Sequence, residues 1–248
     1  MNTLTQGAGF CNLPGPVMVK SLVMIGLITA VPQEAGLLLE QLRGPRQDGP
    51  LLRGLLQGRE TACVCSGVGV ANAAWAATVL AERLRPRLLV VLGTGGAYPG
   101  SGLRPCQVVA AEAEVYADSG AGREGMKALG LALLEKGPRR FFNEFPLSRA
   151  PLKLLRKALP QVKTARFATV CASSRGPSRP RRLREAYNVQ VENMEGAAVV
   201  QVALRYGIQV LELRAISNRA GRAPHRAVLG RAALACQEAL LELLKHLP

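Results

Sequence analysis

Two kinds of hydrophobic pattern alternate along the chain. Residues 22–29 and 209–216 are nearly continuous apolar runs, which are typical of strands buried on both faces of a sheet. Residues 33–42 and 71–84 instead place apolar side chains three or four positions apart, as on one face of a helix. Over the whole chain the pattern predicts strands at 22–29, 61–66, 87–92, 107–113, 163–170, 189–192 and 209–216, and helices at 33–42, 71–84, 148–158, 195–206 and 227–245.

Strands that alternate with helices predict a parallel or mixed sheet covered by helices on both faces. A chain of 248 residues with a hydrophobic fraction of 48% is long enough for one such domain with a large core. We therefore expect a single α/β domain over residues 18–248, built as a three-layer sandwich around a central mixed sheet. Residues 120–160 carry the weakest pattern.

The first residues allow two interpretations. Lys20 and the apolar residues after it resemble a short secretory signal, but they lead directly into a helical pattern without a small-residue cleavage site. The apolar run is also too short to cross a bilayer as a helix, so a buried first strand is the better interpretation. Residues 1–17, which contain Gly and Pro, are expected to form a loose leader, and Met18 is a candidate start of the natural chain.

The formal net charge of +15 raises nucleic acid and acidic membranes as partners. The basic residues are spread along the chain, however, and the one dense group, residues 175–184, has no interleaved aromatic side chains to stack on bases. Six cysteines lack the Cys-x-x-Cys spacing of zinc and redox sites, which favours a reducing compartment. We expect a cytoplasmic protein that needs no metal or cofactor and binds neither nucleic acid nor membranes, while anionic small substrates stay open.

Acidic side chains follow two of the predicted strands, where ligands bind in sheets of this kind. Glu34 lies in the first turn after residues 22–29, and a carboxylate there is able to take a proton from water. Glu192 and Glu195 flank a strand-to-helix corner, and either carboxylate is able to accept both hydroxyls of a ribose. Each of these acids also fits a simpler role, because acids are favoured near helix N-termini.

Two glycine-rich segments follow strands as well. The stretch GTGGAYPGSG after residues 87–92 permits close approach of the backbone to a ligand, although any tight crossover uses such residues. SGVGVAN, residues 66–72, resembles a phosphate-binding turn, but it lacks the third glycine and the downstream acid of the dinucleotide fingerprint. A nicotinamide cofactor is therefore not expected.

Taken together, these segments resemble one family, the nucleoside phosphorylase and nucleosidase superfamily, and within it the futalosine hydrolases of menaquinone biosynthesis. The resemblance runs from about Val23 to Ala239. It implies hydrolysis of the N-glycosidic bond of futalosine with release of hypoxanthine, and a homodimer or larger homo-oligomer. The segments that carry it are GLITAVPQE, SGVGVANAA, VLGTGGAYPGSGL, VENMEGAAVVQVA and LRAISN, with EVYAD and NEFPL as further specific parts.

The resemblance also implies residue roles on the sugar side of the site. Glu34 matches the acid that activates water, and Glu195 matches the acid that binds the ribose hydroxyls and stabilises the positive sugar. Met194 packs beside that sugar, and Arg214 corresponds to a strand arginine near the water. Two glycines, Gly95 and Gly96, line the site.

On the purine side the resemblance implies a role for Ser217 and Asn218, with Val170 and Cys171 at the start of the facing loop. Related methylthioadenosine and S-adenosylhomocysteine nucleosidases have an aspartate where this chain has Asn218. An amide is a poor proton donor, but its NH2 can donate to N7 or O6 and its carbonyl can accept an N–H, so a 6-oxopurine such as hypoxanthine suits it. The simpler alternative is that Asn218 caps the strand end.

Three further activities stay open at this stage. An adenine-releasing nucleosidase requires Asn218 to replace aspartate without loss, and a 6-oxopurine nucleoside phosphorylase requires turnover that depends on phosphate. Glu34 favours water as the nucleophile, since a carboxylate repels phosphate. A binding protein without catalysis is the third alternative. The arginines of residues 175–184 serve either as a basic surface or as a grip on the carboxylate of futalosine.

Overall fold

The computed structural model describes residues 24–247. The predicted leader, residues 1–17, lies outside this part of the chain. Within it, no helix is long and apolar enough to cross a membrane.

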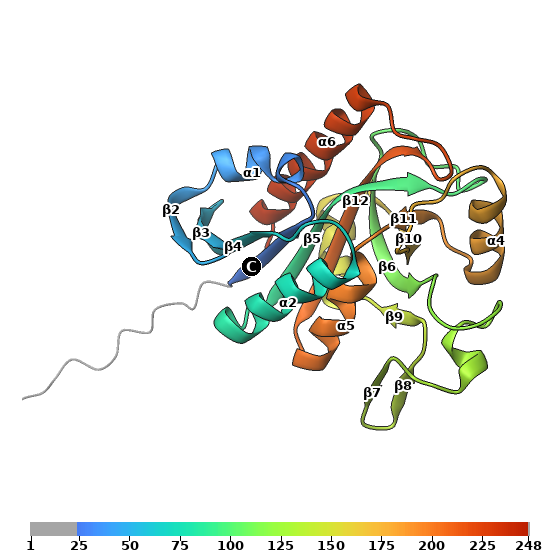
Figure 1. Ribbon diagram of the computed structural model, residues 1–248. Coiled ribbons are helices and arrows are strands. Elements are labelled where there is room, and N and C mark those ends of the chain that lie inside the picture. The colour runs from blue at the N-terminus through green and yellow to red at the C-terminus, as the bar shows by residue number, and fades with distance from the viewer. Residues whose placement is uncertain (1–23, 248) are drawn as a thin grey trace, which may run out of the picture.

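A ten-stranded mixed sheet forms the centre of the molecule, in the order β11-β10-β6-β12-β5-β1-β4-β3-β2, with β9 paired to β6 (Figure 1). Its middle strands β5, β1 and β4 run parallel, and the residues of β1 and β5 are almost all buried, as the continuous apolar runs predict. The strands of this sheet are β1 (Ile25–Thr29), β2 (Arg43–Asp48), β3 (Leu51–Leu56), β4 (Arg59–Cys65), β5 (Leu88–Ala97), β6 (Val108–Tyr116), β9 (Glu144–Pro146), β10 (Lys163–Thr169), β11 (Val191–Asn193) and β12 (Gln209–Arg219).

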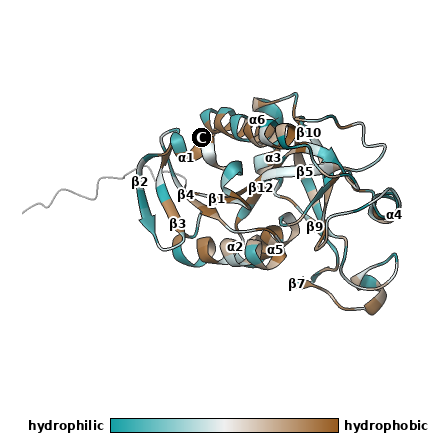
Figure 2. Ribbon diagram, turned by 45° about the horizontal axis from the view of Figure 1, so that its top comes forward, coloured by the Kyte–Doolittle hydropathy of each residue, from teal (hydrophilic) through white to brown (hydrophobic). Residues whose placement is uncertain are grey.

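Helices cover both faces of the sheet, which confirms the three-layer sandwich with a central mixed sheet. Helices α2 and α5 pack together on one face, and α1 and α6 lie on the other (Figures 1 and 2). The helices are η1 (Pro32–Glu34), α1 (Gly36–Glu40), α2 (Val70–Leu84), η2 (Met126–Leu129), α3 (Arg149–Ala158), α4 (Ser178–Tyr187), α5 (Gly196–Tyr206) and α6 (Arg226–Lys245).

One end of the sheet closes on itself. The short strand β11 pairs with β10 on one side and, in antiparallel fashion, with the end of β5 on the other. Strands β5, β12, β6, β10 and β11 therefore form a closed circuit of hydrogen-bonded neighbours. This closure brings the turn after β11, which carries Glu195, beside the carboxyl ends of β5 and β12.

Several boundaries differ from the predicted ones. The helix predicted at 33–42 is a 3-10 turn, η1, followed by the short helix α1. Strand β5 continues through Ala97, and β12 continues through Arg219 past a bulge between Ile216 and Asn218. The glycine-rich segment that was predicted as a loop therefore belongs partly to strand β5, because residues 93–97 continue to pair with β12 and β11.

Some elements escaped prediction altogether. The hairpin of β2 and β3 has an exposed first strand without alternating apolar positions, so no period marks it. The arginine-rich residues expected as a loop include helix α4, whose buried side chains are Pro180 and Leu183. The weakly patterned middle contains β9 and a small separate hairpin of β7 (Leu134–Lys136) and β8 (Arg139–Phe141).

Candidate active site

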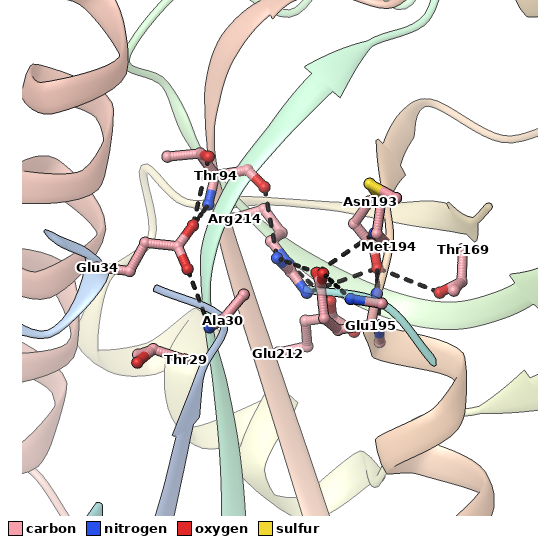
Figure 3. Close-up of polar contacts among 12 residues, drawn as sticks. Thr29, Ala30, Glu34, Thr94, Thr169, Asn193, Met194, Glu195, Glu212 and Arg214 are labelled. Atoms are coloured by element: carbon pink, nitrogen blue, oxygen red, sulfur yellow. Dashed lines mark hydrogen bonds and ion pairs between the residues drawn. The ribbon is translucent and has the colours of Figure 1, made fainter. Parts of the chain in front are cut away.

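Glu34 is fixed between the carboxyl ends of two parallel strands. Its side chain is buried, and its Oε1 accepts a hydrogen bond from the Thr94 backbone N–H on β5 at 2.8 Å. The Thr94 hydroxyl lies 3.4 Å from the same oxygen, and Oε2 accepts the Ala30 N–H at 3.1 Å (Figure 3). Pro32 opens the 3-10 turn that directs the carboxylate back over β1. The acid is therefore held in one position by backbone donors.

Arg214 lies at the centre of the site, where its positive charge interacts with the surrounding carboxylates. Its Nε donates to Glu212 at 2.9 Å, and its Nη1 donates to Glu195 at 3.1 Å. A Cβ added to Gly93 would lie 2.7 Å from both Arg214 Nη1 and Glu34 Oε1, so only a glycine leaves room for the two groups there. Burial opposes the charged guanidinium, but the charges of Glu212, Glu195 and Glu34 outweigh burial and raise the pKa of Arg214. Arg214 therefore stays charged.

Glu195 follows β11 at the amino end of α5. Its Oε1 accepts the Gly69 N–H at 3.1 Å, from the glycine-rich turn before α2, while its Oε2 accepts Arg214. The turn is held by Asn193, whose Oδ1 accepts the N–H groups of Glu195 and Gly196 at 2.9 and 2.8 Å. Met194 is half-buried beside it. Three segments far apart in sequence thus aim one carboxylate at the edge of the sheet (Figure 3).

Glu192, the other acid considered for the ribose, makes different contacts. Its carboxylate accepts the N–H and hydroxyl of Ser174 at 2.9 and 2.5 Å and the hydroxyl of Tyr98 at 3.0 Å. Burial and the charge of Glu192 raise the pKa of Tyr98, so the phenol stays a donor. These bonds tie Glu192 to the loops after β5 and β10, which leaves Glu195 as the candidate for the ribose.

Asn218 makes local contacts with both ends of its amide. Its Oδ1 accepts the Ser217 hydroxyl at 2.7 Å, and its Nδ2 donates to the carbonyls of Arg219 and Arg222 at 3.0 and 2.8 Å. The amide thus holds the turn after β12, as the simpler interpretation of a strand-end cap predicts. Its NH2 hydrogens are both engaged, whereas Oδ1 keeps a second lone pair. Of the two modes considered for the purine, acceptance of an N–H by Oδ1 therefore fits this arrangement better.

The remaining predicted residues surround this edge in different ways. Gly96 pairs with Glu192 and Asn218 across the strands, and Gly95 packs against Val191 so closely that a Cβ would lie 2.7 Å from its side chain. Val170 is fully buried in an apolar cluster and its N–H donates to the Asn193 carbonyl at 2.9 Å, so the residue presents no exposed surface to a ligand in this structure. Cys171 is exposed, and its N–H donates to Asp118.

The arginine-rich group lies outside the cluster of acids. Arg179 pairs with Asp118 at 2.6 Å and also donates to the Ala172 carbonyl, and the Arg184 guanidinium packs near Gly100. A cavity of about 910 Å³ lies elsewhere, at the amino ends of β5 and β12, where Leu88 and Gln209 line it. The acids lie at the opposite ends of these strands, so this cavity is separate from the candidate site.

Sequence reasoning missed several residues of the site. Thr94 and Gly93 belong to the glycine-rich segment that was singled out, but only the fold shows that they contact Glu34 and Arg214. Asn193 stands within the segment VENMEGAAVVQVA, but the resemblance implies no role for it. Glu212 stands in the nearly continuous apolar run 209–216, so the sequence offers one signal for it, a charged residue at a position that the pattern makes buried, whereas Glu114 carries no such signal.

The fold and the site define the class. Residues 24–245 match the sequence model of the family described as the phosphorylase superfamily, so the chain belongs to that superfamily. Among curated proteins, it is 38% identical to futalosine hydrolase from Thermus thermophilus over 156 residues, which cover 63% of this chain and 68% of that protein. It is also 26% identical to 5'-methylthioadenosine/S-adenosylhomocysteine nucleosidase from Bacillus cereus over 80% of this chain and 87% of that protein.

Solved structures agree on the fold. A 5'-methylthioadenosine/S-adenosylhomocysteine nucleosidase from Neisseria meningitidis superposes with a TM-score of 0.81 at 22% identity, covering 91% of this chain and 100% of that one. Futalosine hydrolase from Helicobacter pylori superposes with a TM-score of 0.79 at 18% identity, covering 91% and 99%. With the curated relatives, these findings confirm the predicted resemblance and the prediction of an enzyme of the N-glycosyl hydrolase class.

Proposed function

We propose that the chain hydrolyses the N-glycosidic bond of futalosine, releasing hypoxanthine and dehypoxanthine futalosine in menaquinone biosynthesis. The observation that carries the proposal is the pair of buried acids, Glu34 and Glu195, set around Arg214 at the carboxyl edge of the sheet. The 38% identity to the Thermus thermophilus enzyme supports futalosine over other nucleosides. The protein is further proposed to act in the cytoplasm as a homodimer or larger homo-oligomer.

In this mechanism Glu34 takes a proton from the attacking water. The Thr94 and Ala30 N–H groups hold its carboxylate on one side, which leaves the remaining lone pairs for the water. Glu195 binds the ribose hydroxyls and stabilises the positive charge that develops on the sugar as the bond to the base breaks. Met194 packs beside the sugar, and Arg214 holds Glu195 in place.

Water is the proposed nucleophile rather than phosphate. In this proposal the carboxylate of Glu34 lies where an attacking anion would approach, and the repulsion between like charges supports water as the nucleophile. The guanidinium of Arg214 is already bonded to Glu212 and Glu195, so it is poorly placed to offer its charge to a phosphate. This arrangement weighs against the phosphorylase alternative.

The direct test incubates purified protein with futalosine, inosine and methylthioadenosine, with and without phosphate, and identifies the released base by chromatography. Hypoxanthine from futalosine in the absence of phosphate is the expected result. Adenine from methylthioadenosine, with futalosine left intact, would instead assign the chain to the adenine-releasing nucleosidases, the second candidate supported by the Bacillus cereus relative. Turnover that requires phosphate would reject hydrolysis.

Replacing Asn218 by aspartate is expected to move base preference toward adenine nucleosides. A protonated aspartate donates to N7, whereas the amide is a poor acid. The ratio of kcat/KM for methylthioadenosine to that for futalosine should rise about tenfold or more, the order of one buried hydrogen bond gained and one lost. The aspartate also loses the donors to Arg219 and Arg222, so Tm is measured alongside.

Asn218→Ala is the matched control for this change. It removes the same local bonds and the contact of the amide with the base without supplying an acid, so it should slow futalosine and raise the ratio less than Asn218→Asp does. An aspartate variant with the selectivity of the wild type would show that residue 218 does not read the base.

A further inference from the structure

Behind Glu195 lies a second pair of acids that the proposed mechanism does not use. Glu114 on β6 and Glu212 on β12 are both fully buried, and Glu34 and Glu195 are buried close by. Within residues 24–247, Arg214 is the only buried cation. Four carboxylates around one guanidinium would leave a large negative charge out of contact with water, which is strongly unfavourable.

The two hidden carboxyl groups meet at Gly196. A Cβ on this residue would overlap an oxygen of Glu114 and both oxygens of Glu212, so both groups press against the same backbone position. Glu212 Oε2 has no hydrogen-bond partner apart from what Glu114 is able to offer. Two ionised carboxylates at such close approach repel, whereas one shared proton turns the contact into a hydrogen bond.

The proton belongs on Glu114. Burial and the neighbouring charge of Glu212 raise the pKa of Glu114 well above its ordinary value. Burial also raises the pKa of Glu212, but the Arg214 charge opposes that shift. A protonated Glu114 has an O–H to donate to Glu212 Oε2, and its other lone pairs accept from Asn193 Nδ2 at 2.6 Å and from the Thr169 hydroxyl at 2.7 Å. Each polar group then has a partner.

Two routes lead from this pair to Glu195. On the first, Glu212 accepts Arg214 Nε at 2.9 Å, and Arg214 Nη1 holds the Glu195 carboxylate. On the second, Glu114 accepts the amide of Asn193, whose Oδ1 fixes the backbone of Glu195 (Figure 3). The position of Glu195, the candidate ribose-binding acid, therefore depends on whether Glu114 is protonated, both through Arg214 and through Asn193.

We propose that Glu114 is a positioning residue that holds a proton against Glu212 and thereby fixes Glu195 through Arg214 and Asn193. The benefit for catalysis rests on the proposed function, but the shared proton does not. Besides Glu212 and Arg214 on β12, the ionisable groups around Glu114 are Glu195 at the start of α5 and Tyr116 on its own strand. Loss of the proton would add a negative charge beside Glu212 and loosen the grip on Arg214.

The pH dependence of stability tests the shared proton without any substrate. Glu114 has a raised pKa in the folded state, so its contribution to stability is complete below the unfolded pKa of about 4.3 and declines as pH rises toward the folded value. Glu114→Gln keeps one N–H donor for Glu212 and binds no proton. The free energy of unfolding of the wild type should therefore fall more steeply with pH than that of Glu114→Gln, by the slope of one proton.

Infrared spectroscopy provides a second readout. The wild type at neutral pH should show the C=O stretch of a protonated carboxylic acid, and Glu114→Gln should lack that band. Glu112→Gln, an exposed acid on the same strand, is the matched control and should retain the band. A wild-type spectrum without this band would overturn the proposal, and this measurement does not require any variant to fold.

Kinetics then test positioning. Glu114→Gln should retain most of kcat and should lack the decline in kcat that is expected of the wild type at alkaline pH, whereas Glu114→Ala should lose kcat more than it raises KM. Equal losses in both variants, or an unchanged alkaline limb in Glu114→Gln, would contradict the positioning role. If no nucleoside is turned over, the proposed function fails. The infrared and stability measurements still decide whether Glu114 and Glu212 share a proton.

Discussion

Replacing Glu34 by glutamine is expected to lower kcat by about 10²–10⁴-fold, the usual contribution of a general base, while KM changes little. The amide cannot take the proton of the attacking water. Its shape is the same, and its oxygen still accepts part of the backbone N–H groups that hold Glu34, either that of Thr94 or those of Ala30 and Val31. Steady-state kinetics on futalosine, or on whichever nucleoside is cleaved fastest, measure the loss.

Glu40→Gln is the control for this experiment. It removes the same charge from an exposed position at the end of α1, so it should leave kcat and Tm near those of the wild type. Nearly normal turnover in Glu34→Gln would remove Glu34 from the role of base. A thermal scan of Glu34→Gln should accompany the kinetics, because a large decrease in Tm would show damage to the fold rather than to the chemistry.

The position of the site was predictable because it depends on strand ends. Strand β1 lies within the apolar run predicted at 22–29, strand β12 includes the run at 209–216, and the acids and amides after such runs gather at one edge of the sheet. Glu34 and Arg214 stand at that edge, although their separation in sequence gives no hint that Gly93 lies between them. That contact depends on which strands are neighbours, and hydrophobic pattern does not specify strand order.

The elements and contacts that could not be predicted from the sequence were missed for other physical reasons. Helix α4 begins at Ser178 and carries few apolar side chains, so helical periodicity cannot mark it. Asn218 was open to two interpretations because its bonds to Arg219 and Arg222 depend on the bulge in β12, which has no signature in sequence. Glu114 stands between alanines and a valine in β6, where alternation alone would place a charge on a solvated face.

Glu114 is fully buried although Glu112, two positions earlier on the same strand, is exposed, and this burial reverses that expectation and creates the electrostatics of the site. A carboxyl group forced into the interior must be neutralised by a proton or a cation. This chain uses both, a proton for Glu114 and Arg214 for Glu212 and Glu195. The buried Arg214 is therefore expected to matter for folding as well as for the position of Glu195.

Replacing Arg214 by methionine is expected to lower the free energy of unfolding by about 3–5 kcal/mol. The substitution keeps an unbranched side chain but leaves Glu195 and Glu212 buried without their cation. Denaturant unfolding measures the loss. Turnover should fall as well, since the carboxylate of Glu195 would be held only by the N–H groups of Gly69 and Met194.

Two comparisons separate charge from packing. Arg182→Met removes an exposed arginine on α4 and should change stability by no more than about 0.5 kcal/mol. Adding Glu212→Gln to Arg214→Met removes one of the two stranded charges, so the double variant should be more stable than Arg214→Met alone. If the second substitution instead lowers stability further, the penalty arises from lost packing around Arg214, and the ion pairs are not what requires an arginine at this position.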